Sequence, residues 1–121
     1  MKKVIILFIF VIALCGCSVN GKDELKSVTC SEKDEILKSN SNAMLIDVRT
    51  EEEYNEGHIE KAINIPYDKV VEGLSVYGII NFDVPLIVYC KSGGRSSEAA
   101  ESLVNAGYNN VYDLGAMSNC D

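Results

Sequence analysis

The stretch "LIVYCKSGGRSSEAA", residues 86–100, sets the fold of this chain. Its first half is an apolar run without polar alternation, which predicts a strand covered on both faces. Two glycines follow, and then a helical pattern in which Ala99, Ala100 and Leu103 share one face. A buried strand that passes through a short turn into an amphipathic helix is typical of α/β proteins.

The rest of the chain alternates in the same way. Ser31, with Asp34 three residues later, is the expected start of one helix, and Thr50 caps another. Apolar strands that alternate with helices predict an α/β fold, with a mainly parallel central sheet of about five strands flanked by helices on both faces. The expected strands are 27–30, 43–48, 62–65, 85–90 and 111–115, and the expected helices are 31–39, 50–57, 67–80 and 96–107.

The first 16 residues have the pattern of an export signal. Two lysines precede an apolar run, which is shorter than the roughly 20 residues that a membrane-spanning helix needs. Residues 14–17, "LCGC", resemble the lipobox of bacterial lipoproteins. We therefore expect a signal peptide at 1–16, lipid attachment at Cys17, a polar tether at 17–26 and one domain at 27–121. The expected location is the outer face of the bacterial cell membrane, or the periplasm; a plain secretory signal and an uncleaved anchor are the alternatives.

The net charge of the chain is negative. It is -7 for the whole sequence, and loss of Lys2 and Lys3 with the signal would make it -9. Nucleic-acid binding needs a basic face, so we expect no nucleic-acid partner. Any anion-binding site must be built locally against this acidic background.

The five cysteines divide into groups. Cys15 would leave with the signal and Cys17 would carry lipid, which leaves Cys30, Cys90 and Cys120 in an oxidising setting. Three thiols form at most one pair, so one stays free. A free thiol in an exported protein indicates a use for it.

Cys90 lies at the expected end of a central strand, where parallel sheets bind their ligands. Lys91 and Arg95 bring positive charge, the helix that begins near Ser96 points its amino end at the loop, and the glycines let backbone N–H groups converge. These features favour a thiolate, the reactive form of cysteine. The alternative is a buried and inert cysteine. The candidate substrate-binding residues are Lys91, Ser92, Gly93, Gly94, Arg95 and Ser96.

Two segments carry a family resemblance. "LIDVRTEEEYNEGHIEKAINIPYD", residues 45–68, and "YCKSGGRSSEAAESLVNAGYNNVYDLG", residues 89–115, resemble the single-domain form of the rhodanese-like family. The resemblance implies that Cys90 is a nucleophile that holds a sulfane sulfur as a persulfide, while Arg95 and Lys91 bind a small anionic donor such as thiosulfate. It implies cyanide or a thiol as acceptor, and neither a cofactor nor a metal. A non-catalytic sulfane-sulfur carrier or anion-binding module of the same fold is the alternative.

Loop length separates this interpretation from a phosphatase or an arsenate reductase. Related phosphatases have five residues between the cysteine and the arginine, whereas Cys90 and Arg95 enclose four. The shorter ring suits one sulfur atom and crowds a tetrahedral phosphate or arsenate.

Other residues of the first family segment have a functional and a structural interpretation. Asp47 and Arg49 either support the loop or form a structural ion pair, for example Arg49 with Glu56, and we favour the structural interpretation. We expect His58 to be packed and hydrogen-bonded rather than a base, and the acids at 51–53 to be a solvated helix start.

Cys30 and Cys120 depart from the family, as does the lack of tryptophan and of a further terminal helix. In the family fold the first and last strands are neighbours, which would bring Cys30 and Cys120 close enough for a disulfide. The alternative is that one of them resolves the Cys90 persulfide, with a thiol-redox protein as partner.

Overall fold

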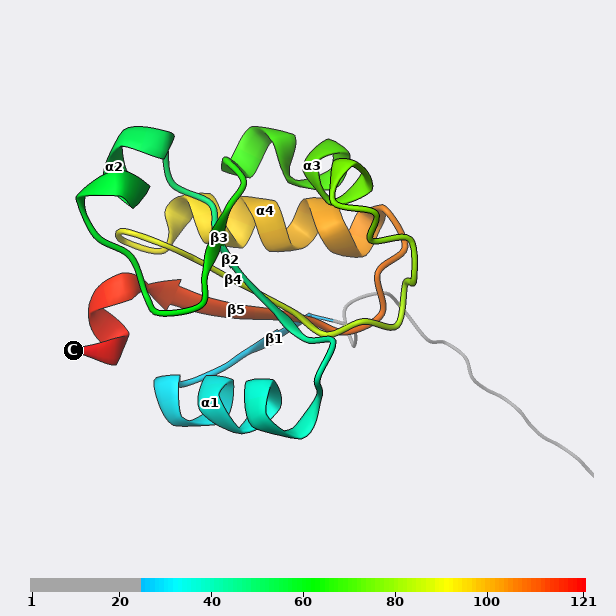
Figure 1. The fold of residues 1–121 in the computed structure, drawn as a ribbon, viewed down its shortest axis with the longest axis horizontal. Helices are drawn as coiled ribbons and strands as arrows, with labels where there is room; N and C mark the ends of the chain where they lie inside the picture. The colour runs from blue at the N-terminus through cyan, green and yellow to red at the C-terminus, as the bar shows by residue number, and fades with distance from the viewer. Residues whose placement is uncertain (1–24) are drawn as a thin grey trace, which may run out of the picture.

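The computed structural model describes residues 25–121, which form one parallel five-stranded sheet with helices on both faces (Figure 1). The strand order is β1-β5-β4-β2-β3, so β4 lies in the centre. The predicted α/β fold is therefore confirmed. The elements are β1 (Leu25–Ser27), α1 (Cys30–Ser39), β2 (Met44–Asp47), α2 (Glu51–Glu56), β3 (Ile63–Asn64), η3 (Tyr67–Lys69), α3 (Val70–Val76), β4 (Leu86–Cys90), α4 (Gly94–Asn105), β5 (Val111–Ala116) and η4 (Met117–Cys120), where η marks a 3₁₀ helix.

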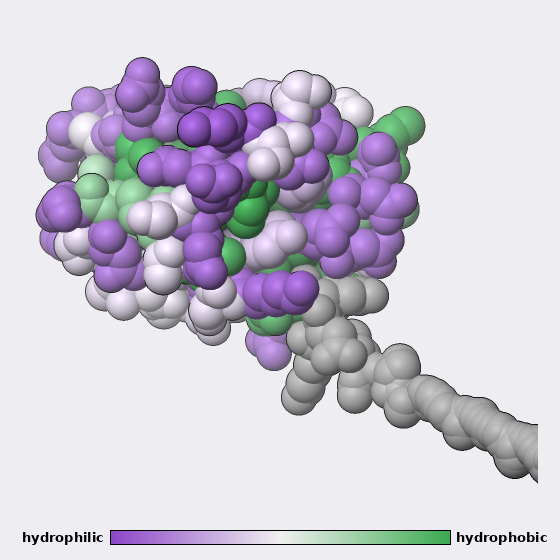
Figure 2. Space-filling model, turned by 90° about the horizontal axis from the view of Figure 1, so that it is seen from below, coloured by the Kyte–Doolittle hydropathy of each residue, from purple (hydrophilic) through white to green (hydrophobic). Residues whose placement is uncertain are grey.

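Two apolar layers sandwich the sheet, one on each face. Val88 and Cys90 of β4 face the layer that includes Leu103 of α4, while Ile87 and Tyr89 face the other, with α1. All five residues of β4 are buried, which explains why its sequence lacks polar alternation. Figure 1 shows α3 and α4 on one side of the sheet and α1 on the other. The face seen in Figure 2 is largely hydrophilic, with small hydrophobic areas between the polar side chains.

The amino-terminal boundaries differ from the prediction. The first strand ends at Ser27, and Cys30 begins α1 instead of ending the strand. Thr29, not Ser31, is the N-cap: its hydroxyl accepts from the Glu32 amide, and the Glu32 carboxylate accepts from the Thr29 amide. Leu25 and Lys26 belong to β1 and pair with β5, so these two residues of the predicted 17–26 tether belong to the domain.

Two helices also differ from their expected bounds. The segment 67–80 contains the 3₁₀ turn η3 and then α3, which ends at Val76. The helix after Cys90 starts at Gly94, two residues earlier than expected, so that Arg95 and Ser96 lie in its first turn. The predicted signal and the lipid-bearing Cys17 lie outside the described residues. Within residues 25–121, none of the helices is both long enough and apolar enough to cross a bilayer.

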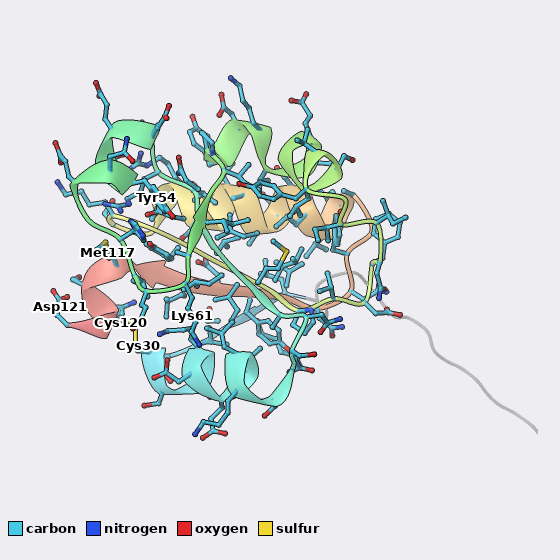
Figure 3. All side chains as sticks on the ribbon, viewed as in Figure 1. Cys30, Tyr54, Lys61, Met117, Cys120 and Asp121 are labelled. Atoms are coloured by element: carbon cyan, nitrogen blue, oxygen red, sulfur yellow. A yellow bond between two sulfur atoms is a disulfide. The ribbon has the colours of Figure 1, made fainter. Side chains whose placement is uncertain are left out.

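A disulfide joins Cys30 at the start of α1 to Cys120 in η4, 90 residues away in the sequence. Figure 3 shows this bond beside Met117, at the end of the sheet where the strands terminate. The bond attaches the last turn of the chain to α1. Cys90 is free. The structure therefore contains the predicted Cys30–Cys120 disulfide, and neither of these two cysteines is bonded to Cys90.

Removal of this disulfide should lower the free energy of unfolding. A cross-link over so long a loop restricts the unfolded chain, and such bonds typically contribute about 2–4 kcal/mol. We expect a loss of this size for the Cys30→Ser/Cys120→Ser double variant in urea titrations. The wild-type protein under reducing conditions is the matched control and should unfold at the same urea concentration as the double variant. An unchanged midpoint in both would show that the bond contributes little.

Candidate functional site

Cys90 is the last residue of the central strand, at the carboxyl edge of the sheet. It lies opposite Ala116 of β5. Just before Cys90 the pairing of β4 with β5 shifts by one residue: Val88 pairs with Asp113, but Tyr89 pairs with Gly115. This bulge is made with Gly115 in the left-handed region, at a φ of 84°. In Figure 1 the loop after β4 lies at the same end of the sheet as α2 and η4.

The Cys90 sulfur accepts hydrogen bonds from the backbone of the following loop. The Gly93 amide lies 2.9 Å from Sγ and the Ser96 amide 3.3 Å from it. Gly93 is the N-cap of α4 and has a φ of 105°, in the left-handed region that favours glycine. A side chain would find open space at this position, so backbone conformation, not packing, requires glycine there. The loop therefore turns its amides inward, toward the sulfur.

These contacts set the ionisation of the thiol. Burial raises the pKa of Cys90, but the adjacent Ser96 side chain and the hydrogen bonds from the loop amides lower it by more. Those amides belong to Ser96, Gly93 and Ser92. The pKa of Cys90 is thus lowered from that of an ordinary cysteine. Hydrogen bonds to the charged form produce this direction of shift.

Cys90 is also completely buried, with an exposed fraction of 0%. It belongs to the apolar layer on the α4 face of the sheet. The sulfur thus combines an apolar environment on one side with converging amides on the other. Because the sulfur is buried, access as well as ionisation governs its reactivity.

Arg95 has a partner that the sequence analysis missed. Its Nη1 and Nη2 donate to the two carboxylate oxygens of Glu53 in α2, at 2.8 and 3.1 Å. Glu53 also accepts from the Thr50 amide, at 3.0 Å. Hydrogen bonds from Arg95 and Thr50 lower the pKa of Glu53 to about 2, so this carboxylate is charged at neutral pH. The prediction that residues 51–53 are all solvated was wrong for Glu53. The Thr50-x-x-Glu53 capping pattern was the sequence signal that could have predicted a hydrogen-bonded Glu53 side chain.

Asp47 and Arg49 form a buried ion pair beneath the loop. Arg49 Nη2 lies 2.6 Å from Asp47 Oδ2 and 2.6 Å from the Gly57 carbonyl oxygen. The predicted pairing of Arg49 with Glu56 was wrong; residues two apart at a strand end share a face, and this places Arg49 beside Asp47. Tyr89 donates its hydroxyl proton to Asp47 at 2.8 Å and accepts from the Ile59 amide at 3.0 Å. The pair therefore ties β2 to β4 and to the end of α2.

Within the described part of the chain, the remaining candidates make no hydrogen bond to the sulfur, and three of them are exposed. Lys91 is exposed at the start of the loop, and Gly94 is the exposed first residue of α4. His58 stacks on the Tyr54 ring, with centroids 3.8 Å apart, and its Nδ1 lies 3.0 Å from the Tyr54 carbonyl oxygen. His58 is thus packed and hydrogen-bonded as expected, although it is exposed. Among residues 25–121 there is no cluster of three or more His, Cys, Asp or Glu side chains suited to a metal ion.

The family description "Rhodanese-like domain" matches residues 29–118, most of the chain. The chain belongs to the rhodanese-like family. It is 34% identical over 106 residues to thiosulfate sulfurtransferase 18 of Arabidopsis thaliana, covering 77% of this chain and 75% of that protein. It is 42% identical over 79 residues to the mitochondrial protein HIGH ARSENIC CONTENT 1 of the same plant, covering 58% of this chain. The chain spans only 47% of the length of that second relative.

Solved rhodanese-like structures share the fold. The human single-domain sulfurtransferase TSTD1 aligns with a TM-score of 0.66 and 26% identity, covering 77% of this chain and 92% of the human one. Several relatives are named thiosulfate sulfurtransferases, so sulfur transfer is supported for this chain at the level of the family.

Proposed function

We propose that this chain is a sulfurtransferase that moves a sulfane sulfur from thiosulfate or a related donor to cyanide or a thiol through a persulfide on Cys90. The observation that carries the proposal is the position of the Cys90 sulfur. It lies at the carboxyl end of the central strand and accepts from the Gly93 and Ser96 amides. These contacts favour a thiolate in the loop that matches the family pattern.

The chemistry has two steps. The Cys90 thiolate attacks the outer sulfur of thiosulfate, the S–S bond of the donor breaks, and sulfite leaves with the electron pair. The terminal sulfur of the resulting persulfide carries the negative charge, one atom further from the strand, where the loop amides can stabilise it. Cyanide or a thiolate then attacks that sulfur and regenerates the Cys90 thiolate. Because a covalent intermediate separates the two substrates, ping-pong kinetics are expected.

A sulfane-sulfur carrier is the second candidate. The full burial of Cys90 and the neutralisation of Arg95 by Glu53 favour it, since both slow the approach of an anionic donor. In this case the loop would hold a persulfide for delivery to a partner protein, such as a thiol-redox protein, and turn over slowly with small molecules.

A single assay separates the two candidates. The purified chain is incubated with thiosulfate, its Cys90 peptide is analysed by mass spectrometry, and thiocyanate is measured after cyanide is added. Repeated turnover supports the enzyme, whereas one sulfur per chain without turnover supports the carrier. Failure to load any sulfur on Cys90, from thiosulfate or from an alkyl persulfide, would contradict both.

We also propose that the protein is exported and anchored through a lipid on Cys17. The support is the sequence pattern of residues 1–17, with its lysines, apolar run and small residues before the cysteine. Palmitate labelling in a bacterial host should mark the wild-type protein and not the Cys17→Ala variant; equal labelling of the two would contradict the anchor.

A further inference from the structure

The Glu53–Arg95 pair is the basis of a further inference, which rests on the proposed sulfur transfer. Arg95 lies in the first turn of α4, next to the loop amides that hold the Cys90 sulfur. It is near enough to the thiol that a charge on Cys90 raises the pKa of Arg95, although the hydrogen bonds from Arg95 to Glu53 raise it more. The Arg95 guanidinium therefore contributes to the electrostatic potential at the Cys90 sulfur.

Glu53 cancels most of that positive charge. Its two carboxylate oxygens bind two different nitrogens of Arg95, and both side chains are about 30% exposed, at 31% and 27%. Such a fork-to-fork pair has a fixed geometry and a net charge of zero. The neighbouring cation Arg49 is likewise neutralised, by Asp47. The described residues at this end of the loop thus stabilise the thiolate mainly through amide dipoles, and the side chain of Lys91 is exposed to solvent.

When Arg95 is neutralised, the electrostatic repulsion between the Cys90 thiolate and a sulfur donor depends strongly on the charge of the donor. Thiosulfate brings two negative charges to a thiolate that already carries one, and cancellation of Arg95 leaves this repulsion largely uncompensated. A protonated alkyl persulfide with an uncharged tail brings none, and its anion brings one. The binding of such donors is therefore weakened only slightly when Arg95 is neutralised.

We propose that Glu53 is a specificity-determining residue, which neutralises Arg95 and so favours donors of low charge, such as alkyl persulfides, over the thiosulfate dianion. In the favoured reaction the Cys90 thiolate attacks the outer sulfur of the protonated persulfide. The bond from Sγ to that sulfur forms, the S–S bond of the donor breaks, and an alkyl thiolate leaves with the electron pair. The proton stays on the transferred sulfur, so charge and atoms balance.

The Glu53→Gln variant tests this role. Glutamine keeps an oxygen that can accept from Thr50 and Arg95, and it removes only the charge. Loading of Cys90 is measured in the full chain with two donors, thiosulfate and the persulfide of 2-mercaptoethanol. We expect kcat/KM for thiosulfate to rise relative to that for the persulfide by about 3- to 10-fold, mainly through KM. The gain should shrink as ionic strength increases, because salt screens the exposed charge of Arg95.

Glu52→Gln is the matched control. Glu52 is exposed on the same turn of α2, so its replacement changes the net charge equally without releasing Arg95. Its donor ratio should stay at the wild-type value. A ratio unchanged in Glu53→Gln, or raised equally in Glu52→Gln, would overturn the proposal while leaving sulfur transfer intact. If neither donor loads Cys90 in the wild-type chain, the proposed function itself fails, and this inference with it.

Discussion

Replacement of Cys90 with serine should abolish sulfur transfer, with a loss of about 1,000-fold or more in kcat. A serine hydroxyl stays protonated at neutral pH, and its oxygen cannot carry the transferred sulfur as a persulfide. The loop amides of Gly93 and Ser96 would then face a neutral oxygen instead of a sulfur anion. The change is measured as thiocyanate formation from thiosulfate and cyanide.

A neighbouring serine provides the control for this loss. Ser97 is exposed on the outer side of the same helical turn, so Ser97→Ala should retain wild-type turnover. Cys90→Ser should keep the thermal unfolding midpoint near that of the wild type, because the two side chains differ little in size. Substantial turnover in a folded Cys90→Ser protein would remove Cys90 from the mechanism.

Asp47→Ala should cause the largest loss of stability, about 3–5 kcal/mol. Asp47 is fully buried, and it accepts from the Arg49 guanidinium and from the Tyr89 hydroxyl. Its removal leaves a buried cation and a buried hydroxyl without their acceptor, and the cost of leaving a charge unpaired dominates. Urea titration of the purified variant measures the loss of free energy of unfolding.

Two further variants make this prediction specific. Asp68→Ala removes an exposed carboxylate and should change the free energy of unfolding by no more than about 0.5 kcal/mol. In a double-mutant cycle with Arg49→Met, the double variant should lose less than the sum of the two single variants, because the unpaired charge is gone. Strict additivity would mean that Asp47 and Arg49 do not interact as the geometry indicates.

The sheet was predictable because its central strands are apolar on both faces. The runs at 43–48 and 85–90 lack polar alternation, and only a sheet covered on both sides buries such strands. Helix starts were less predictable, since several residues can cap. Both Thr29 and Ser31 are suitable N-caps, and the bond between Thr29 and Glu32 decides the choice in the structure.

The loop chemistry was predictable from the local sequence, whereas the charges around it were not. Cys90, the glycines and Ser96 lie within seven residues, so that a turn after a strand brings them together. Arg95 and Glu53 are 42 residues apart, and no local pattern specifies their contact. Tyr89 was missed because an aromatic residue in an apolar strand indicates packing, and its hydroxyl partner lies on another strand.

The converging amides of Gly93 and Ser96 stabilise the Cys90 thiolate, and alkylation measures this directly. The full chain is treated with iodoacetamide across a range of pH, and modification of the Cys90 peptide is followed by mass spectrometry. Because the pKa of Cys90 is lowered, its alkylation should fall off at a lower pH than that of the single cysteine in an unstructured reference peptide. A midpoint equal to that of the peptide, or above it, would contradict stabilisation of the thiolate by the loop.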